Sequence, residues 1–440
     1  MSGVNVRKSS TPDLVTAALA ALFFAAAAVV GAVGYGGERL VLAWPPLFAR
    51  WEPHTGPGTP AALVVAGLTV LYGPPLARRL PWRWVPVAAA GGSLAWIWSL
   101  ALIDGWRPGI YGTLAYGHEY LTVMDRIGGI HDFLSTFTDH IPDGAPGQWP
   151  AHVAGHPPGA TLTFVVLDRI GLAGGGWATA FCVTAAAGGA AAVLITVRAL
   201  AGEELARRAA PFMVVAPAAV WLGVSADAWF TAGAARAVAL LALAATRSVR
   251  APRAAAFGSG LLFGLLLYLS YGLVLMGVVG LAVLYLAREW RPLPWLLLGV
   301  VPWAVAFTAA GFWWFDGYFT LVDRYYAGAG GHRPYAYFVW ANLAVQVASV
   351  GLAAVAGLRR AALRRSWRGP LTVLVGSALC AMLLADVSGM SKAETERIWL
   401  PFAVWLLPAA ALLPYRHARW WLAAQAVLAF CVNSLWLTRW

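Results

Sequence analysis

Charged side chains are scarce in this sequence, and cysteine is scarcer still. Only 11% of the 440 residues are charged, whereas 60% are apolar. A water-soluble chain of this length would need far more polar surface to cover its core, so the composition excludes an ordinary soluble protein. The three cysteines, Cys182, Cys380 and Cys431, fall inside apolar stretches without CxxC spacing, which argues against structural disulfides and thiolate metal sites. No Walker A, GxGxxG or HExxH motif indicates another class of enzyme.

Long apolar runs are abundant instead. The stretch from Leu14 to Tyr35 has no charge and is long enough to cross about 30 Å of hydrocarbon as a helix. Helices are expected because backbone groups in lipid must bond within their own segment, and the runs lack the alternation of barrel strands. We therefore predict an all-α polytopic membrane protein with about 13 transmembrane helices. The predicted spans are 13–34, 60–77, 85–103, 175–198, 209–224, 226–246, 254–269, 271–288, 293–311, 336–357, 370–386, 397–413 and 419–437.

The basic residues support this threading. Twenty of the 31 lysines and arginines fall in short turns that the threading places in the cytoplasm, as the positive-inside rule requires. The agreement depends on segment 159–172, which contains Asp168 and Arg169 and which we interpret as a helix at the outer interface that does not cross. The N-terminus is then cytoplasmic and the C-terminus outside the plasma membrane. The basic residues behind the net charge of +12 are distributed over the loops and do not form a patch. We therefore predict membrane lipids, and no nucleic acid, as partners.

The acidic and histidine residues gather on the opposite, outer side. Of the 19 carboxylates only four are cytoplasmic in this threading, and of the eight histidines only His417 is. A channel or an anchor would not need so much polar material on one face. We expect one membrane domain in three parts: a three-span segment at 1–103, an outer loop with interfacial helices at 104–174, and a membrane bundle at 175–440.

Glu119 is the first catalytic candidate in the outer loop. A carboxylate held beside a membrane-embedded cavity can act as a general base on a sugar hydroxyl. The alternative is an ordinary solvated loop acid. Asp125, Asp132 and Asp104 are weaker candidates than Glu119, and of these we count Asp125 as catalytic.

His152 and His156 are candidate substrate-binding residues in the same loop. With His118 and Glu119 they could also supply ligands to a divalent cation, so such a cofactor is possible, although none is certain. A histidine beside Pro157, Pro158 and Gly159 can equally serve only to fix a turn.

Two intramembrane or membrane-edge charges need an explanation. Asp227 lies at the outer tip of a tight hairpin, where an ionisable group is costly unless it faces water or a partner, and we count it as substrate-binding. Arg236 lies inside the same span. It is either part of a structural ion pair, a snorkelling side chain, or part of a cavity lining.

Two later outer segments combine cations with aromatic rings. Arg324, Tyr325 and Arg333 suit a phosphate headgroup and sugar rings together, because guanidinium binds phosphate and aromatic faces stack on sugars. The alternative is an aromatic interface belt with two anchoring arginines. In the segment from Ser391 to Phe402, Lys392, Glu394, Glu396 and Arg397 crowd the entrance of a span. Lys392, Glu396 and Arg397 are candidates for binding a phosphate and its sugar.

These motifs resemble those of the GT-C superfamily of membrane glycosyltransferases, which use polyprenyl-phosphate sugars. More narrowly, they resemble uncharacterised multi-spanning actinobacterial proteins that are themselves similar to envelope mannosyl- and arabinosyltransferases. The matching stretches are HEYL at 118–121, AHVAGHPPG at 151–159, SADAWF at 225–230, DRYYAG at 323–328 with HRPY at 332–335, and SKAETERIWLPF at 391–402. The resemblance implies a GT-C-like helical bundle and inverting transfer from a lipid-phosphate donor. It makes Glu119 the catalytic carboxylate and Lys392 and Arg397 the contacts to the donor phosphate. The sequence departs from the superfamily in having two extra spans before Glu119.

The leading hypothesis is therefore a glycosyltransferase that moves a sugar from a polyprenyl-phosphate donor to an envelope glycan or lipid acceptor at the outer face. The alternative is a lipid-linked sugar transporter or flippase, which would place polar residues along a path through the spans. A third hypothesis is a structural protein whose outer loops bind a partner.

Overall fold

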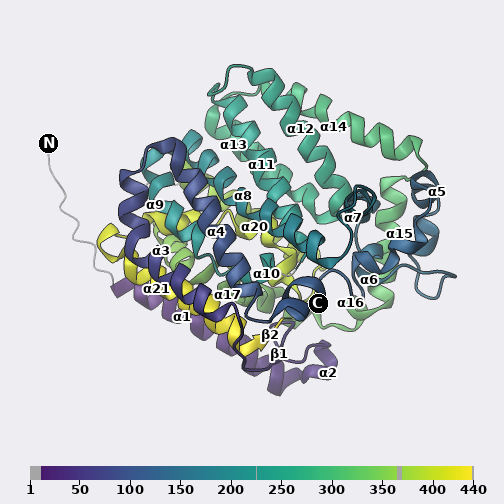
Figure 1. Ribbon diagram of the computed structural model, residues 1–440, viewed down its shortest axis with the longest axis horizontal. Helices are drawn as coiled ribbons and strands as arrows, with labels where there is room; N and C mark the ends of the chain where they lie inside the picture. Colours follow the sequence, from purple (N-terminus) through teal and green to yellow (C-terminus); the bar gives the residue numbers. More distant parts are fainter. Residues whose placement is uncertain (1–10, 224, 364–368, 439–440) are drawn as a thin grey trace.

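The computed structural model describes residues 11–223, 225–363 and 369–438, and it is an all-α polytopic membrane protein (Figure 1). Within these residues nine helical segments are long and apolar enough to span a bilayer. They are α1 (Thr11–Val29, continued by a π-helical turn Val30–Tyr35), α3 (Thr59–Arg79), α4 (Val85–Ala101, preceded by a 3₁₀ turn Trp82–Trp84), α8 (Gly175–Ala201), α11 (Asp227–Ala245), α12 (Pro252–Leu269), α14 (Pro292–Ala309), α17 (Tyr335–Leu363) and α18 (Pro370–Val387). Nine of the predicted spans match these segments.

Three further predicted spans are helical but shorter or less apolar. Span 271–288 is a 3₁₀ turn (Tyr271–Leu275) followed by α13 (Met276–Ala287). Span 397–413 consists of α19 (Thr395–Ile398), α20 (Leu400–Ala403) and a 3₁₀ turn (Leu407–Leu412). The last predicted span, 419–437, is α21 (Ala418–Leu435) after a 3₁₀ turn (Tyr415–His417).

The prediction of one continuous span over 209–224 is wrong. The chain forms α9 (Glu203–Val214), leaves the helical conformation at Val215, and forms only the short α10 (Ala219–Leu222) beyond Pro217. Proline lacks an N–H and disfavours the helical conformation in the residue before it, which explains the break. The break is buried inside the bundle, where irregular backbone is tolerated at membrane depth. Residue 224 lies outside the described residues.

Short helices and turns make up the remaining polar segments. α5, α6, α15 and α16 gather at one end of the molecule (Figure 1). The elements are α2 (Gly37–Leu40), a π-helical turn (Arg107–Tyr111), a 3₁₀ turn (Tyr120–Arg126), α5 (Ile130–Ser135), a 3₁₀ turn (Thr138–His140), α6 (Ala151–Ala154), α7 (Pro158–Arg169), α15 (Trp314–Ala327) and α16 (Ala329–His332). The two short strands β1 (Arg50–Trp51) and β2 (Trp436–Leu437) pair antiparallel.

Helix α7 corresponds to the segment that the sequence predicts not to cross. It has 12 residues, or about 18 Å of helix, which is too short for a bilayer core of about 30 Å. Its buried face packs on α12, where Gly159 lies so close to the carbonyl of Tyr268 that a Cβ could not be accommodated. The length therefore agrees with the predicted threading.

Small residues bring the long helices together. α11 packs between α8 and α12, and α14 lies along α12. At the α12–α14 contact a Cβ on Gly260 would overlap the carbonyl of Leu296, and one on Gly299 would overlap the carbonyl of Phe257. Without a hydrophobic driving force between helices in lipid, such close backbone approach supplies the packing energy.

A buried ion pair joins the beginning of the described chain to α17. Asp13 is fully buried and accepts hydrogen bonds from Arg360, with Nε 2.8 Å from Oδ1 and Nη2 2.6 Å from Oδ2. Arg359 Nη1 lies 3.3 Å from the same carboxylate. The bidentate arrangement fixes α1 against α17.

Candidate active site

Four segments far apart in the sequence bring a set of ionisable side chains together. We call Glu119, His152, Asp227, Glu394 and Arg397 the outer cluster. They come from the residue before the 120–126 turn, from α6, from the start of α11, and from the segment around α19. Glu119 is 1% exposed, and Asp227 and Arg397 are each 4% exposed. Such a concentration of charge inside a protein is expensive and marks a candidate functional site.

Glu119 is buried with unfilled capacity to accept hydrogen bonds. Its Oε1 lies 2.6 Å from His152 Nδ1, but the angle of this contact departs from that of a good hydrogen bond. Among the described residues neither carboxylate oxygen of Glu119 has a well-aligned donor. A carboxylate in this condition can take up a proton from a hydroxyl group brought beside it.

The contacts of His152 define its tautomer. Arg397 Nη2 lies 3.3 Å from His152 Nε2. Arginine can only donate, so Nε2 must accept, and in the neutral ring the proton is then on Nδ1, which faces Glu119. The imidazole thus connects the guanidinium of Arg397 to the carboxylate of Glu119.

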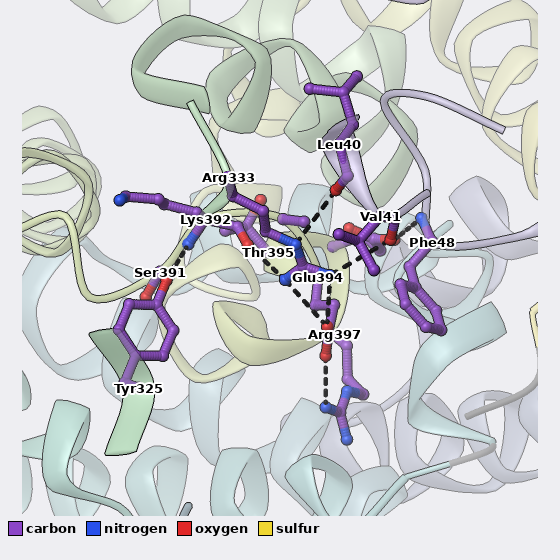
Figure 2. Close-up of polar contacts among 12 residues, drawn as sticks. Leu40, Val41, Phe48, Tyr325, Arg333, Ser391, Lys392, Glu394, Thr395 and Arg397 are labelled. Carbon is purple, nitrogen blue, oxygen red and sulfur yellow. Dashed lines mark hydrogen bonds and ion pairs between the residues drawn. The ribbon is translucent and has the colours of Figure 1, made fainter. Parts of the chain in front are cut away.

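Arg397 is the centre of the cluster. Its Nη1 lies 3.5 Å from Asp227 Oδ2, and its Nη2 lies 3.4 Å from Glu394 Oε2. Glu394 in turn pairs with Arg333 at 3.3 Å, so it bridges the two guanidinium groups (Figure 2). A planar guanidinium surrounded by carboxylates is already placed to bind a phosphate that replaces one of them.

The segment that carries Arg397 has a strained backbone. Ala393 and Glu394 both adopt positive φ, at 73° and 63°, although neither is glycine. Such conformations cost of the order of 1–3 kcal/mol each, and they persist mainly where the surrounding structure holds them for a function. Strain beside a buried charged cluster therefore supports a functional role for this segment.

Polar side chains of α17 hold the strained segment in place. Asn342 Nδ2 donates to the carbonyl of Ser391 at 2.7 Å, and Gln346 Nε2 donates to that of Thr395 at 2.8 Å. Ser349 Oγ donates to the carbonyl of Glu396 at 3.2 Å. Because the three side chains project from one helix at positions 342, 346 and 349, they fix the segment along its length.

The predicted phosphate ligands Arg333 and Lys392 bind protein groups in this structure. Arg333 donates to the carbonyls of Leu40 and Lys392, at 3.2 and 2.7 Å, besides its pair with Glu394. Lys392 Nζ donates to the carbonyl of Gly330 at 2.7 Å. The Lys392 backbone N–H donates to the predicted ligand Tyr325 at its hydroxyl, 3.0 Å away (Figure 2). These contacts join segment 329–335 to segment 391–397 and leave substrate binding by the three residues a prediction.

Two other predicted site residues lie apart from the cluster. Arg324 donates to the carbonyls of Ile141 and Trp149, at 2.7 and 3.0 Å, and so holds α15 on the outer loop. Asp125 is exposed on the 120–126 turn, and within the described residues it makes no hydrogen bond or ion pair with the side chains of the cluster. The structure thus brings together Glu119, His152, Asp227 and Arg397, but not Arg324 or Asp125.

His156 lies next to the cluster and contacts the backbone of His152 and the side chain of Tyr120. Its Nδ1 lies 2.8 Å from the carbonyl of His152, to which it donates, and 3.0 Å from the hydroxyl of Tyr120. Burial lowers the pKa of His156 to about 3, and burial with the nearby Asp227 carboxylate raises the pKa of Tyr120 well above its ordinary value. Both side chains are therefore neutral near pH 7 and position His152 without adding charge.

The described residues contain no group of three or more His, Cys, Asp or Glu side chains arranged to hold a metal ion. A shared cation site of His118, Glu119, His152 and His156 is therefore not preformed in this arrangement.

Two partners in the site were missed at the sequence level. Glu394 was counted among the charges of its segment without a role, yet it bridges two arginines. The backbone N–H of Phe48 donates to Glu396 Oε1 at 2.9 Å, which links the 36–58 loop to the site. The sequence holds no signal for the contact of Phe48, because a backbone donor is present at nearly every residue.

Glu396 predicts a pH dependence of stability. Burial raises the pKa of its carboxyl from 4.5 to about 7. The folded state then binds the proton more tightly than the unfolded state, so the free energy of unfolding falls as pH rises from about 4.5 to 7, by an amount on the order of 3 kcal/mol. We expect Glu396→Gln to remove this fall and to be more stable than the unmutated protein above pH 7. Melting temperatures of both proteins in detergent from pH 4.5 to 8 measure it; parallel curves would refute the assignment.

No protein-family model matches the chain, and no curated protein is similar to it at a significant level. One solved structure that it resembles is that of the Archaeoglobus fulgidus oligosaccharyltransferase in complex with zinc and sulfate, at 15% sequence identity and a TM-score of 0.46. The match covers 80% of this chain and 53% of the archaeal chain, so the chain spans about half the length of that enzyme.

Proposed function

We propose that this protein is a glycosyltransferase that moves a sugar from a polyprenyl-phosphate donor to a glycan or lipid acceptor at the outer face of the membrane. The observation that carries the proposal is the outer cluster, in which one buried base candidate and one buried guanidinium are joined by His152. A sugar transfer from a lipid phosphate needs these two groups, one to take a proton and one to stabilise a departing phosphate.

In the proposed reaction the acceptor hydroxyl attacks the anomeric carbon of the donor sugar. Glu119 takes the hydroxyl proton as the new glycosidic bond forms, and the bond from the anomeric carbon to the phosphate oxygen breaks. The anomeric configuration inverts because the attack and the departure occur on opposite faces.

Arg397 stabilises the polyprenyl phosphate that leaves. The phosphate replaces Asp227 or Glu394 as a partner of the guanidinium, and both present partners are at 3.4–3.5 Å, longer than a tight bidentate pair. The His152 ring keeps the guanidinium and Glu119 at a fixed separation on either side of the reacting centre. Lys392 and Arg333 can bind the phosphate only if they release the backbone carbonyls that they now contact.

The test is to incubate the purified protein with a panel of radiolabelled polyprenyl-phosphate sugars and a crude envelope acceptor. Transferred label and released lipid phosphate are counted in parallel. We expect equal amounts of both for one donor. If a correctly folded protein consumes no donor but moves a lipid-linked sugar across reconstituted vesicles without a covalent product, the transporter alternative replaces this proposal.

A further inference from the structure

Arg236 is a charged residue in the middle of a helix that the proposed reaction does not use. It lies nine residues from each end of α11, which is about 13 Å from either end. Its side chain is partly exposed, and Nη1 donates to the carbonyl of Ala232 at 3.0 Å. Within the described residues no carboxylate lies within ion-pairing distance of it, so the structural ion pair that the sequence allowed does not form inside this chain.

The neighbouring helix α8 is shaped to receive this guanidinium. Gly188 lies in the middle of α8, and a Cβ there would overlap Arg236 Nη2. At the next residue, Gly189, a Cβ would make only ordinary contacts with Ala232 and Ala235, so Gly188 is the position that makes room for the guanidinium. Leu240, one turn along α11, is also partly exposed. Gly188, Arg236 and Leu240 are all partly exposed, so the guanidinium lies against Gly188 on a face of the α8–α11 pair that the described bundle covers only in part, and we call this place the glycine notch.

An anion is needed at this depth. An arginine at the centre of a membrane helix is unfavourable by about 2.5–3.5 kcal/mol, and intramembrane charges normally pair with one another. Lipid phosphates lie at the interface, farther from Arg236 than its own side chain reaches. The carboxylate of an aspartate or glutamate in another membrane helix is the anion available near the bilayer midplane.

A second copy of this chain does not supply that carboxylate. Among the described residues, the long helices carry only Asp13, Asp227 and Asp386, and all three are buried within the chain. The complementary charge must therefore come from a different protein.

We propose that the outward face of α8 and α11 around Arg236 and Gly188 is a docking surface for a transmembrane helix of another protein, with an aspartate or glutamate near its middle. The incoming carboxylate pairs with the guanidinium in the glycine notch, and the two helices bury the charge from lipid. This inference stands independently of the proposed transferase activity.

The test uses synthetic helices as partners. The full-length protein is reconstituted in phosphatidylcholine vesicles with fluorescent leucine–alanine transmembrane peptides that carry a central Glu, Gln or Leu, and association is measured by energy transfer at pH 8. From the strength of polar contacts between membrane helices, we expect the Glu peptide to bind about 3- to 30-fold more tightly than the Leu peptide.

Two variants make the test specific. Arg236→Gln is expected to abolish the preference for the Glu peptide, and Gly188→Ala, which keeps the charge but fills the notch, is expected to reduce it. Equal binding of the Glu and Leu peptides to the unmutated protein would overturn the proposal. So would loss of the preference when phosphatidylglycerol replaces phosphatidylcholine, because that result would assign the notch to an anionic lipid.

Discussion

Replacing Glu119 with Gln is expected to lower sugar transfer by about 10²- to 10⁴-fold, which is the usual contribution of a general base. Gln has nearly the same shape and keeps an oxygen that faces His152 Nδ1, but it cannot take a proton from the acceptor hydroxyl. Since Glu119 is 1% exposed, a change of shape would be felt in the core, and the isosteric replacement avoids this. Transfer rates at saturating donor, with melting temperature in the same detergent, measure the effect.

The matched control is Asp139→Asn. Asp139 is an exposed carboxylate of the same outer loop, outside the cluster, so its neutralisation should leave both transfer and stability unchanged. Asp125→Asn decides between the two catalytic candidates. A large loss of transfer in Asp125→Asn with full activity in Glu119→Gln would move the base to Asp125 and remove the role assigned to the outer cluster.

Arg397→Ala should reduce the free energy of unfolding by about 3–5 kcal/mol, the range for breaking a buried ion pair on one side. The substitution leaves Asp227 buried without the guanidinium that now pairs with it. Transfer should also fall, because the departing phosphate loses its cation. Denaturation in mixed detergent micelles, followed by tryptophan fluorescence, measures the change in stability.

A double variant separates the structural part of this effect. In Arg397→Ala with Asp227→Asn the buried carboxylate is neutralised, so part of the lost stability should return while transfer stays low. Arg397→Lys keeps the positive charge but loses the planar fork, and we expect intermediate stability with reduced transfer. If Arg397→Ala is as stable as the unmutated protein, the guanidinium is not paired in the way described.

The sequence was sufficient for the architecture where a single helix could be recognised from its own residues. Hydropathy alone places α1, α8 and α14, because each must be apolar along the length of a bilayer. It was not sufficient at 209–224, where the apolar run continues through Pro217 but the helix does not. An apolar composition reports burial, and it does not distinguish a continuous helix from a broken one inside the bundle.

The candidate site was predictable in its residue types but not in its pairing. Glu119 was singled out as a possible base, Asp227 because an ionisable group at its place is costly, and Arg397 as a phosphate ligand, and the structure brings the three together. The roles of Arg333 and Lys392 could not be foreseen, because a cation that binds backbone carbonyls has the same sequence signature as one that binds phosphate. Nor does the sequence show that Glu394 adopts a left-handed backbone conformation, because that conformation depends on the hydrogen bonds that side chains of α17 make to the segment.

The ion pair between Asp13 and Arg360 constrains the order of biosynthesis. The two residues are 347 positions apart, so at about 5–20 residues per second a ribosome takes roughly 20–70 s to make the partner of Asp13. During that time α1 has emerged without the two arginines that pair with its carboxylate in the folded chain. The first helix can therefore dock in its final place only late, when α17 has been inserted. Products that stop before residue 359 should keep α1 loosely held and be favoured substrates for membrane quality-control proteases.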